Sequence, residues 1–78
     1  MNSEAVVELV CEIWRQVLEV GEVGEDDDFV ELGGDSIAAV QVVEHLKRRL
    51  GVQLAPDTVL DSPTLREFTA VVRQRLQA

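Results

Sequence analysis

Apolar residues in the first part of the chain recur three and four positions apart: Val6, Leu9, Val10, Ile13, Trp14, Val17 and Leu18. This spacing is typical of an amphipathic helix with one face turned to a core. It predicts a helix from about Ser3 to Leu18. We interpret Trp14 as a core anchor of this helix, and Cys11, which lies close to the apolar face, as a small packed residue.

A second periodic stretch opens at Asp35-Ser36 and ends at about Leu50, and Gly51 suits the position just after a helix. At about 100° per residue, one face of this helix is predicted to be apolar and to contain Ala39, Val40, Val43, Leu46 and Leu50. The opposite face contains Gln41, Glu44, His45 and Arg48. Ile37 falls among these polar residues, so it is expected either to contact a partner or to be covered by a loop.

The last third of the chain predicts two more helices. Pro56 suits a first helical position, which places a short helix near Pro56 to Leu60. Ser62 is suited to be the N-cap of the final helix and Pro63 its first residue. The apolar stripe of that helix is Leu65, Phe68, Val72 and Leu76. These patterns predict an all-α fold, a small bundle of three main helices and one short helix in a single domain over residues 1–78.

The segment 19–35, between the first two predicted helices, is rich in acids and glycines. It holds eight of the fifteen acidic residues, and no Lys or Arg occurs between Arg15 and Lys47. We therefore expect no basic side chain near this segment to offset its charge. A long loop in so small a domain is usually functional, and its acids are a candidate docking surface.

The composition narrows the possible functions. A net charge of -8 argues against nucleic-acid binding, which needs basic clusters, and favours a basic protein partner. One cysteine and one histidine allow no internal disulfide and no zinc site. The start of the chain does not read as a signal peptide, and no apolar run reaches membrane-spanning length. A cytoplasmic protein without metal, nucleic-acid or membrane partners is expected.

Ser36 is the residue with the most distinctive surroundings. Gly33 and Gly34 precede it and allow a tight turn that leaves its hydroxyl uncovered. The start of a helix favours negative charge, so a phosphodiester on Ser36 would be stabilised there. From these residues alone, Ser36 or Asp35 could equally serve only as the N-cap of the helix.

The run Asp28-Phe29-Val30-Glu31-Leu32-Gly33-Gly34-Asp35-Ser36-Ile37 resembles the core motif of carrier proteins in nonribosomal peptide synthesis. Three further segments resemble the same family in order and spacing: Ile13 to Leu18, Gly51 to Leu54, and Ser62 to Leu65. Val30 departs from the pattern, because a second aromatic is common there. The double glycine favours a peptidyl carrier over an acyl carrier of the polyketide or fatty-acid type, which stays open as an alternative.

The resemblance implies a fold like that of acyl carrier proteins and a role without catalysis. It implies that a phosphopantetheinyl transferase attaches 4'-phosphopantetheine from coenzyme A to Ser36. The arm's thiol would hold an aminoacyl or peptidyl group as a thioester. An adenylation enzyme and condensation, tailoring or thioesterase enzymes would be the other partners. We expect them to contact Gly34, Asp35, Ile37 and Gln41. We expect a monomer, and the sequence leaves open whether it is free-standing or a domain cut from a multidomain synthetase.

Three other functions compete with this interpretation. The block Gly34 to Ile37 also resembles the serine motif of one esterase family, but His45, the only histidine, is nine residues from Ser36, on the far side of the same helix. Asp26 to Asp28 lack the glycine and the acid spacing of an EF-hand. A cofactor-free interaction bundle would explain the acidity but not the Gly-Gly-Asp-Ser segment.

Overall fold

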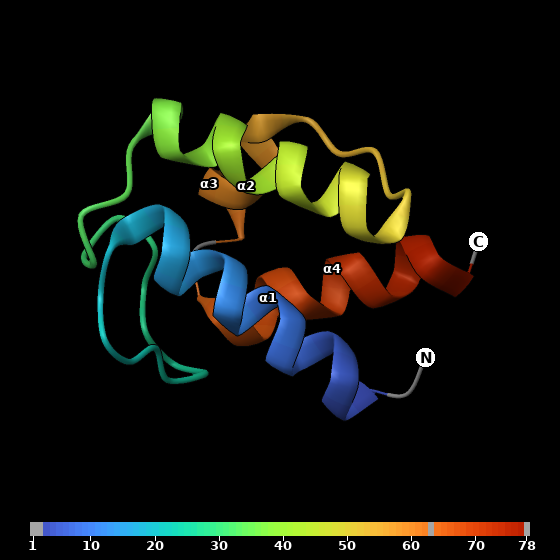
Figure 1. Cartoon of the computed structure of the whole chain (residues 1–78), viewed down its shortest axis with the longest axis horizontal. Helices are drawn as coiled ribbons and strands as arrows, with labels where there is room; N and C mark the ends of the chain where they lie inside the picture. Colours follow the sequence, from blue (N-terminus) through green and yellow to red (C-terminus); the bar gives the residue numbers. More distant parts are fainter. Residues whose placement is uncertain (1–2, 63, 78) are drawn as a thin grey trace.

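The computed structural model describes residues 3–62 and 64–77, which form four helices. They are α1 (Ser3–Leu18), α2 (Ser36–Leu50), α3 (Pro56–Asp61) and α4 (Leu65–Gln77). Helix α2 packs against α1 and α3, and α1 also packs against α4. The loop 19–35 and the start of α2 lie at one end of the molecule, and both chain termini lie at the other (Figure 1). The predicted all-α bundle is confirmed.

The bounds predicted for the first two helices agree with the structure, and α3 is one residue longer than predicted. The predicted start of the last helix is wrong. Ser62 ends α3 instead, since its N–H donates to the carbonyl oxygen of Thr58 at 3.1 Å. Thr64 is the N-cap of α4, because its Oγ1 accepts a hydrogen bond from the Glu67 N–H at 3.1 Å. Pro63 lies outside the described residues.

Three aromatic side chains form the centre of the core. Trp14, Phe29 and Phe68 are all fully buried. The rings of Trp14 and Phe29 meet edge to face with centroids 4.9 Å apart, and Phe68 lies 6.1 Å from Trp14 on a tilted plane. The expected core role of Trp14 is thereby confirmed, and its Nε1 is buried without a hydrogen-bond partner among the described residues. Phe29 brings the loop 19–35 into the same core.

Cys11 occupies a half-buried position beside the core, as its place near the apolar face of α1 predicted. Its Sγ donates a hydrogen bond to the carbonyl oxygen of Val23 at 3.4 Å. The thiol therefore helps to hold the loop 19–35 against α1.

The apolar face of α2 is rotated from its predicted position. Val40 was assigned to the core but is 42% exposed, whereas Val42 is fully buried. Helix α2 packs against α1 on one side and α3 on the other, so its buried face is wider than a single stripe and shifts towards Ala38 and Val42. Leu76 was likewise expected in the core of α4 but is 37% exposed, because it lies in the last turn of that helix.

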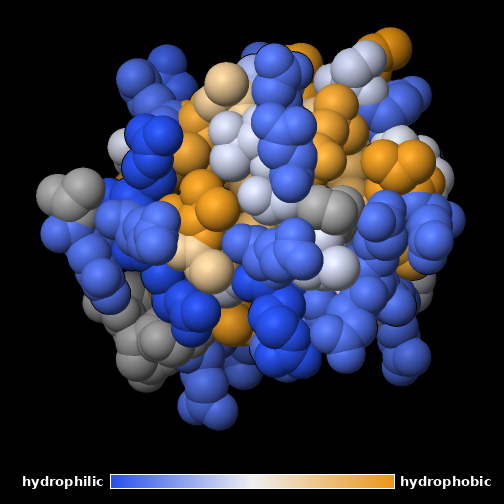
Figure 2. Space-filling model, turned by 180° about the vertical axis from the view of Figure 1, so that it is seen from behind, coloured by the Kyte–Doolittle hydropathy of each residue, from blue (hydrophilic) through white to orange (hydrophobic). Residues whose placement is uncertain are grey.

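The surface of the bundle is mixed. On the face seen from behind, hydrophobic residues emerge in small groups separated by hydrophilic residues (Figure 2). The large apolar side chains that are exposed among the described residues are Val30, Ile37, Val40 and Leu76. Since an isolated exposed apolar residue is ordinary, only those that lie beside other functional residues carry an argument about function.

The acidic loop has a basic neighbour that the sequence analysis did not expect. Arg66, in the first turn of α4, lies 3.4 Å from a Glu25 oxygen and 3.3 Å from an Asp26 oxygen. Its N–H also donates to the carbonyl oxygen of Glu25 at 2.8 Å, and the Leu65 N–H donates to that of Asp27 at 3.2 Å. An isolated bridge pairs Asp28 with Thr64. The loop is therefore fastened to the start of α4, and the expectation that its acids have no basic neighbour is wrong.

Candidate functional site

Ser36 is the first residue of α2, and its side chain is exposed. Asp35 is the N-cap: its backbone is extended, with φ -135°, and its Oδ1 accepts a hydrogen bond from the Ala38 N–H at 2.9 Å. Asp35 therefore takes the capping role that the sequence left open between the two residues. The Ser36 hydroxyl is not needed to cap the helix and faces solvent.

The turn before Ser36 is held in place from below by Phe29. Gly34 is buried, and a Cβ at this position would overlap the Phe29 ring and lie 2.7 Å from the Phe29 carbonyl oxygen. The Gly34 N–H donates to that same oxygen at 2.9 Å. Gly34 was expected on the partner-binding surface, but its burial gives it a structural role instead, as the position where the backbone passes directly over an aromatic ring.

Asp28 organises the turn that leads to Gly34. Its Oδ1 accepts hydrogen bonds from the Val30 N–H at 2.8 Å and the Glu31 N–H at 3.1 Å. Gly33 then takes a positive φ of 100°, which favours glycine. Sequence reasoning did not identify Asp28 and Phe29 as supports of the site. The available signal was that both residues stand at the start of the motif. Their roles depend on the hydrogen bonds of Asp28 and the contact of Phe29 with Gly34, which appear only in the fold.

The start of α2 suits a phosphate group. The backbone N–H groups of Ser36 and Ile37 have no hydrogen-bond partner among the described residues. Free first-turn N–H groups and the helix dipole together favour an anion at this end. A phosphodiester on the Ser36 oxygen would lie beside these N–H groups, so the residues present fit a phosphate-linked cofactor.

Exposed apolar side chains occur in the chain segments on both sides of Ser36. Ile37 is 70% exposed, as expected, and no loop covers it. Val40, one turn further along α2, and Val30, in the preceding loop, are also exposed. Asp35 and Gln41 are exposed as well. We call Val30, Asp35, Ile37, Val40 and Gln41 the arm-side surface.

The described residues offer little for catalysis. They contain no cluster of three side chains able to hold a metal ion. His45 lies nine residues beyond Ser36 on the same helix, which is about 13 Å along the helix axis, too far to act as a base for the hydroxyl. None of the described helices is long and apolar enough to cross a membrane.

Comparison with known proteins identifies the family of this chain. The family model described as the phosphopantetheine attachment site matches residues 8–72, which is most of the chain. The chain belongs to this family. Its cofactor is 4'-phosphopantetheine, and its members are carriers that are not themselves catalytic. The family resemblance inferred from the motif is confirmed.

The curated relatives of this carrier domain are much longer proteins. It is 39% identical over 71 residues to one of the plipastatin synthase proteins of Bacillus subtilis, covering 91% of this chain and 2% of that protein. It is 40% identical over 68 residues to one of the linear gramicidin synthase proteins of Brevibacillus parabrevis, covering 87% of this chain and 1% of that protein. The similarity therefore concerns one small domain within each of these proteins.

Two solved carrier structures share the fold. BlmI, a type-II acyl carrier protein from Streptomyces verticillus involved in bleomycin biosynthesis, superimposes with a TM-score of 0.88 at 27% identity, covering 95% of this chain and 89% of that one. A peptidyl carrier protein in complex with the phosphopantetheine transferase Sfp and coenzyme A gives a TM-score of 0.86 at 31% identity, covering 96% and 95%. The acyl-carrier-protein-like fold predicted from the motif is confirmed.

Proposed function

We propose that the Ser36 Oγ of this carrier is the atom to which phosphopantetheine is attached, and that the arm holds an aminoacyl or peptidyl group. The observation that carries the proposal is that Asp35, and not Ser36, caps the start of α2. Asp35 caps the helix, which leaves the Ser36 hydroxyl exposed beside free backbone N–H groups. The similarity to peptide synthetases supports an amino acid or peptide as the cargo.

The residues of the chain hold and present the cofactor. When bound, phosphopantetheine supplies a thiol that forms a thioester with the cargo. Ser36 anchors it, and the N–H groups of Ser36 and Ile37 stabilise the phosphate charge. Asp35 fixes the first turn, and Phe29 supports Gly34 beneath it. We propose that the chain is not an enzyme, since these residues position a group without providing a base or an oxyanion hole.

We propose that partner enzymes bind at the arm-side surface. These would be a phosphopantetheinyl transferase, an adenylation enzyme, and condensation, tailoring or thioesterase enzymes. The solved structure with Sfp supports a transferase as partner, and the structure described as McyG A-PCP supports an adenylation domain. Ile37 is the natural apolar anchor of this surface, because it is the most exposed of its large apolar side chains. Residues 1–78 would act as one monomeric carrier domain in the cytoplasm, where coenzyme A is available to the transferase.

The attachment is tested by intact-mass measurement after incubation with coenzyme A and a broad-specificity phosphopantetheinyl transferase. The wild-type chain should gain the mass of one phosphopantetheine, and Ser36→Ala should gain none. Ser62→Ala is the matched control, because Ser62 is only partly exposed, at the end of α3, and should not change loading. An unmodified wild-type chain, or a loaded Ser36→Ala variant, would exclude the proposal.

A further inference from the structure

The loop 19–35 and the C-terminal turns of α2 and α4 carry charge of opposite sign. The loop 19–35, with its eight acids, lies at the end where α2 begins (Figure 1). Helices α2 and α4 both end at the opposite side, and their C-terminal halves contain five of the seven basic residues: Lys47, Arg48, Arg49, Arg73 and Arg75. The segments 45–56 and 68–78 contain no Asp or Glu. A protein of net charge -8 thus has a local region of the opposite sign.

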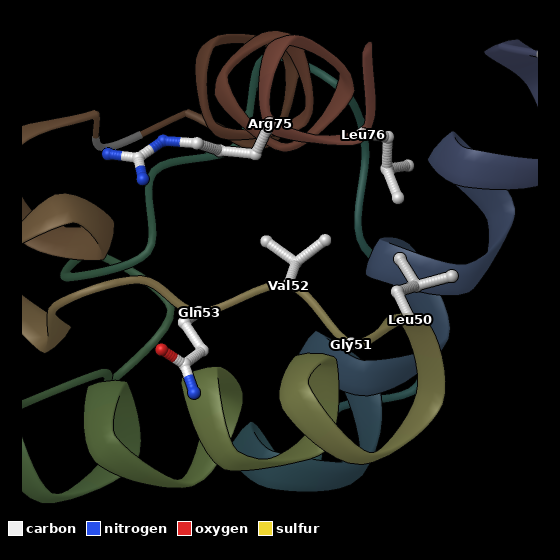
Figure 3. A pocket seen from close by; sticks show the side chains of 6 residues that line it. All are labelled: Leu50, Gly51, Val52, Gln53, Arg75 and Leu76. Carbon is white, nitrogen blue, oxygen red and sulfur yellow. The ribbon is translucent and has the colours of Figure 1, made fainter. Parts of the chain in front are cut away.

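A hollow of about 470 Å³ opens within this basic end. It lies between the last turn of α4 and the turn that follows α2, and it is lined by Leu50, Gly51, Val52, Gln53, Arg75 and Leu76. Figure 3 shows Val52 pointing from the turn towards α4, Leu50 pointing towards Leu76, and the Arg75 side chain extending along the α4 side. The hollow is therefore lined by three aliphatic side chains together with the amide of Gln53 and the cation of Arg75.

Three cations lie in or beside the hollow: Lys47, Arg49 and Arg75. A second hollow of about 300 Å³ shares Gln53 with the first and is lined by both Lys47 and Glu44. At about 100° per residue, Lys47 and Arg49 fall on either side of Leu50. Within residues 3–62 and 64–77, no ion pair involves Lys47, Arg49 or Arg75, and all three are exposed. Arg73 is different, because it lines another hollow together with Glu4 and Glu8.

The helix dipole accounts for basic residues at each helix end taken separately. It does not account for two helix ends converging on one hollow, nor for the exposed Leu76 between them. We propose that this basic end, comprising Lys47, Arg49, Leu50, Val52, Arg75 and Leu76, binds an acidic amphipathic segment of a partner protein. Its carboxylates pair with Arg75, Lys47 and Arg49, and an aliphatic side chain packs on Leu50, Val52 and Leu76.

Charge and size favour a peptide segment over other occupants. A second copy of this chain also has a net charge of -8, so two copies repel one another at long range. A nucleic acid needs an extended basic track, and the acidic loop at the other end repels a long polyanion. A short acidic segment covers the hollow and its cations without reaching that loop.

The position of this surface separates it from the arm. Helix α2 has fifteen residues, so Ser36 and Leu50 are about 21 Å apart along its axis. A partner bound at the basic end leaves Ser36 and the arm-side surface free. The inference thus goes beyond the proposed carrier function and does not depend on modification of Ser36.

Two-dimensional NMR of the ¹⁵N-labelled full chain tests the proposal. The probe is a synthetic twelve-residue peptide of alternating glutamate and leucine pairs, and a peptide with glutamine in place of each glutamate is its control. Titration with the acidic peptide should shift the amide signals of residues 47–53 and 73–76, and binding should weaken as salt rises. Ser36→Ala should bind equally well, which separates this test from the test of arm attachment.

Variants localise the site. Arg75→Gln should weaken binding about three- to fivefold, the loss expected for one partly exposed ion pair. Leu76→Ser should weaken it as well, whereas Arg15→Gln, with the same change in net charge at the other end of the molecule, should not. Shifts confined to the loop 19–35, an absence of shifts at millimolar peptide, or equal effects of Arg75→Gln and Arg15→Gln would overturn the proposal. Dimerisation without peptide in sedimentation velocity would assign the surface to a second copy and overturn it too.

Discussion

Gly34 lies against the Phe29 ring, two residues before Ser36, the proposed attachment position. Replacing it with alanine forces a methyl group into the Phe29 ring and towards the Phe29 carbonyl oxygen. Both neighbours are held in the core, so we expect Gly34→Ala to lower the free energy of unfolding by about 1–3 kcal/mol, as overpacking does. Urea denaturation followed by circular dichroism measures the change.

The chain contains its own control for this substitution. Gly21 has a negative φ and nothing within 4 Å of an added Cβ. Gly21→Ala should leave stability unchanged or raise it by up to about 1 kcal/mol, because it only restricts the unfolded chain. Equal stabilities for the two variants would show that the turn adjusts to a side chain at Gly34 and that Phe29 does not fix it.

Glu19, directly after α1, has a φ of 56°, the one positive value among the described residues other than glycine. This left-handed conformation is the usual way to end a helix, and glycine adopts it without steric cost. Glu19→Gly is therefore expected to raise the melting temperature, with a gain of about 0.5–1 kcal/mol. Glu22→Gly serves as the reference, since it removes the same charge at a position without positive φ. A gain that both variants share would point to relief of acidic repulsion.

At the scale of elements, Arg66 connects the start of α4 to the loop 19–35. Arg66→Gln removes both ion pairs to Glu25 and Asp26 but keeps the backbone hydrogen bonds. Since Arg66 is 59% exposed, the loss of global stability should stay below about 1 kcal/mol. Amide hydrogen exchange in residues 24–28 should nevertheless become faster, because the loop opens locally.

Salt provides the check on this prediction. Raising ionic strength screens exposed ion pairs, so the difference in exchange between Arg66→Gln and wild type should shrink at high salt. Arg48→Gln, which removes a cation with no ion pair in the described structure, should exchange like wild type in this loop. Unchanged exchange in Arg66→Gln would mean that the backbone hydrogen bonds alone hold the loop.

Local patterns were enough to predict the bounds of α1 and α2, because caps and periodicity act over a few residues. Local patterns were not enough to predict which face of α2 is buried. The centre of the buried face is rotated by roughly 50° about the helix axis from the centre of the predicted face, which is half of the 100° step between consecutive residues. That rotation depends on where α1 and α3 lie, as Val40 and Val42 show. The Arg66–Asp26 contact joins residues 40 positions apart, so no local sequence pattern predicts it.

The candidate site divides in the same way. The position of Ser36 at the start of α2 and the exposure of Ile37 could be predicted, because the motif and the polar neighbours of Ile37 are local features. The structural role of Gly34 could not, since it depends on Phe29 folding back beneath the turn. The exposure of Val30 was also missed: the departure from the aromatic pattern places an apolar side chain on the surface.

At the scale of the whole molecule, the two ends are expected to respond differently to mutation. Ile37→Glu places a charge on the arm-side surface without touching the core, because Ile37 is 70% exposed. We expect transfer from a cognate adenylation enzyme to fall by about tenfold or more, as for loss of an interface anchor, with the melting temperature nearly unchanged. Leu76→Glu makes the same kind of change at the other end and should leave this transfer unaffected.

The contact between Trp14 and Phe29 has a practical consequence. The chain has one tryptophan and no tyrosine, so excitation at the red edge of protein absorbance selects this single indole. The indole is dry and touches the ring that supports the turn before Ser36. The carrier thus contains an intrinsic fluorophore that contacts the support of the turn before Ser36, the proposed attachment site. Its emission should follow movement of that turn during loading and partner encounter in real time, with no label added.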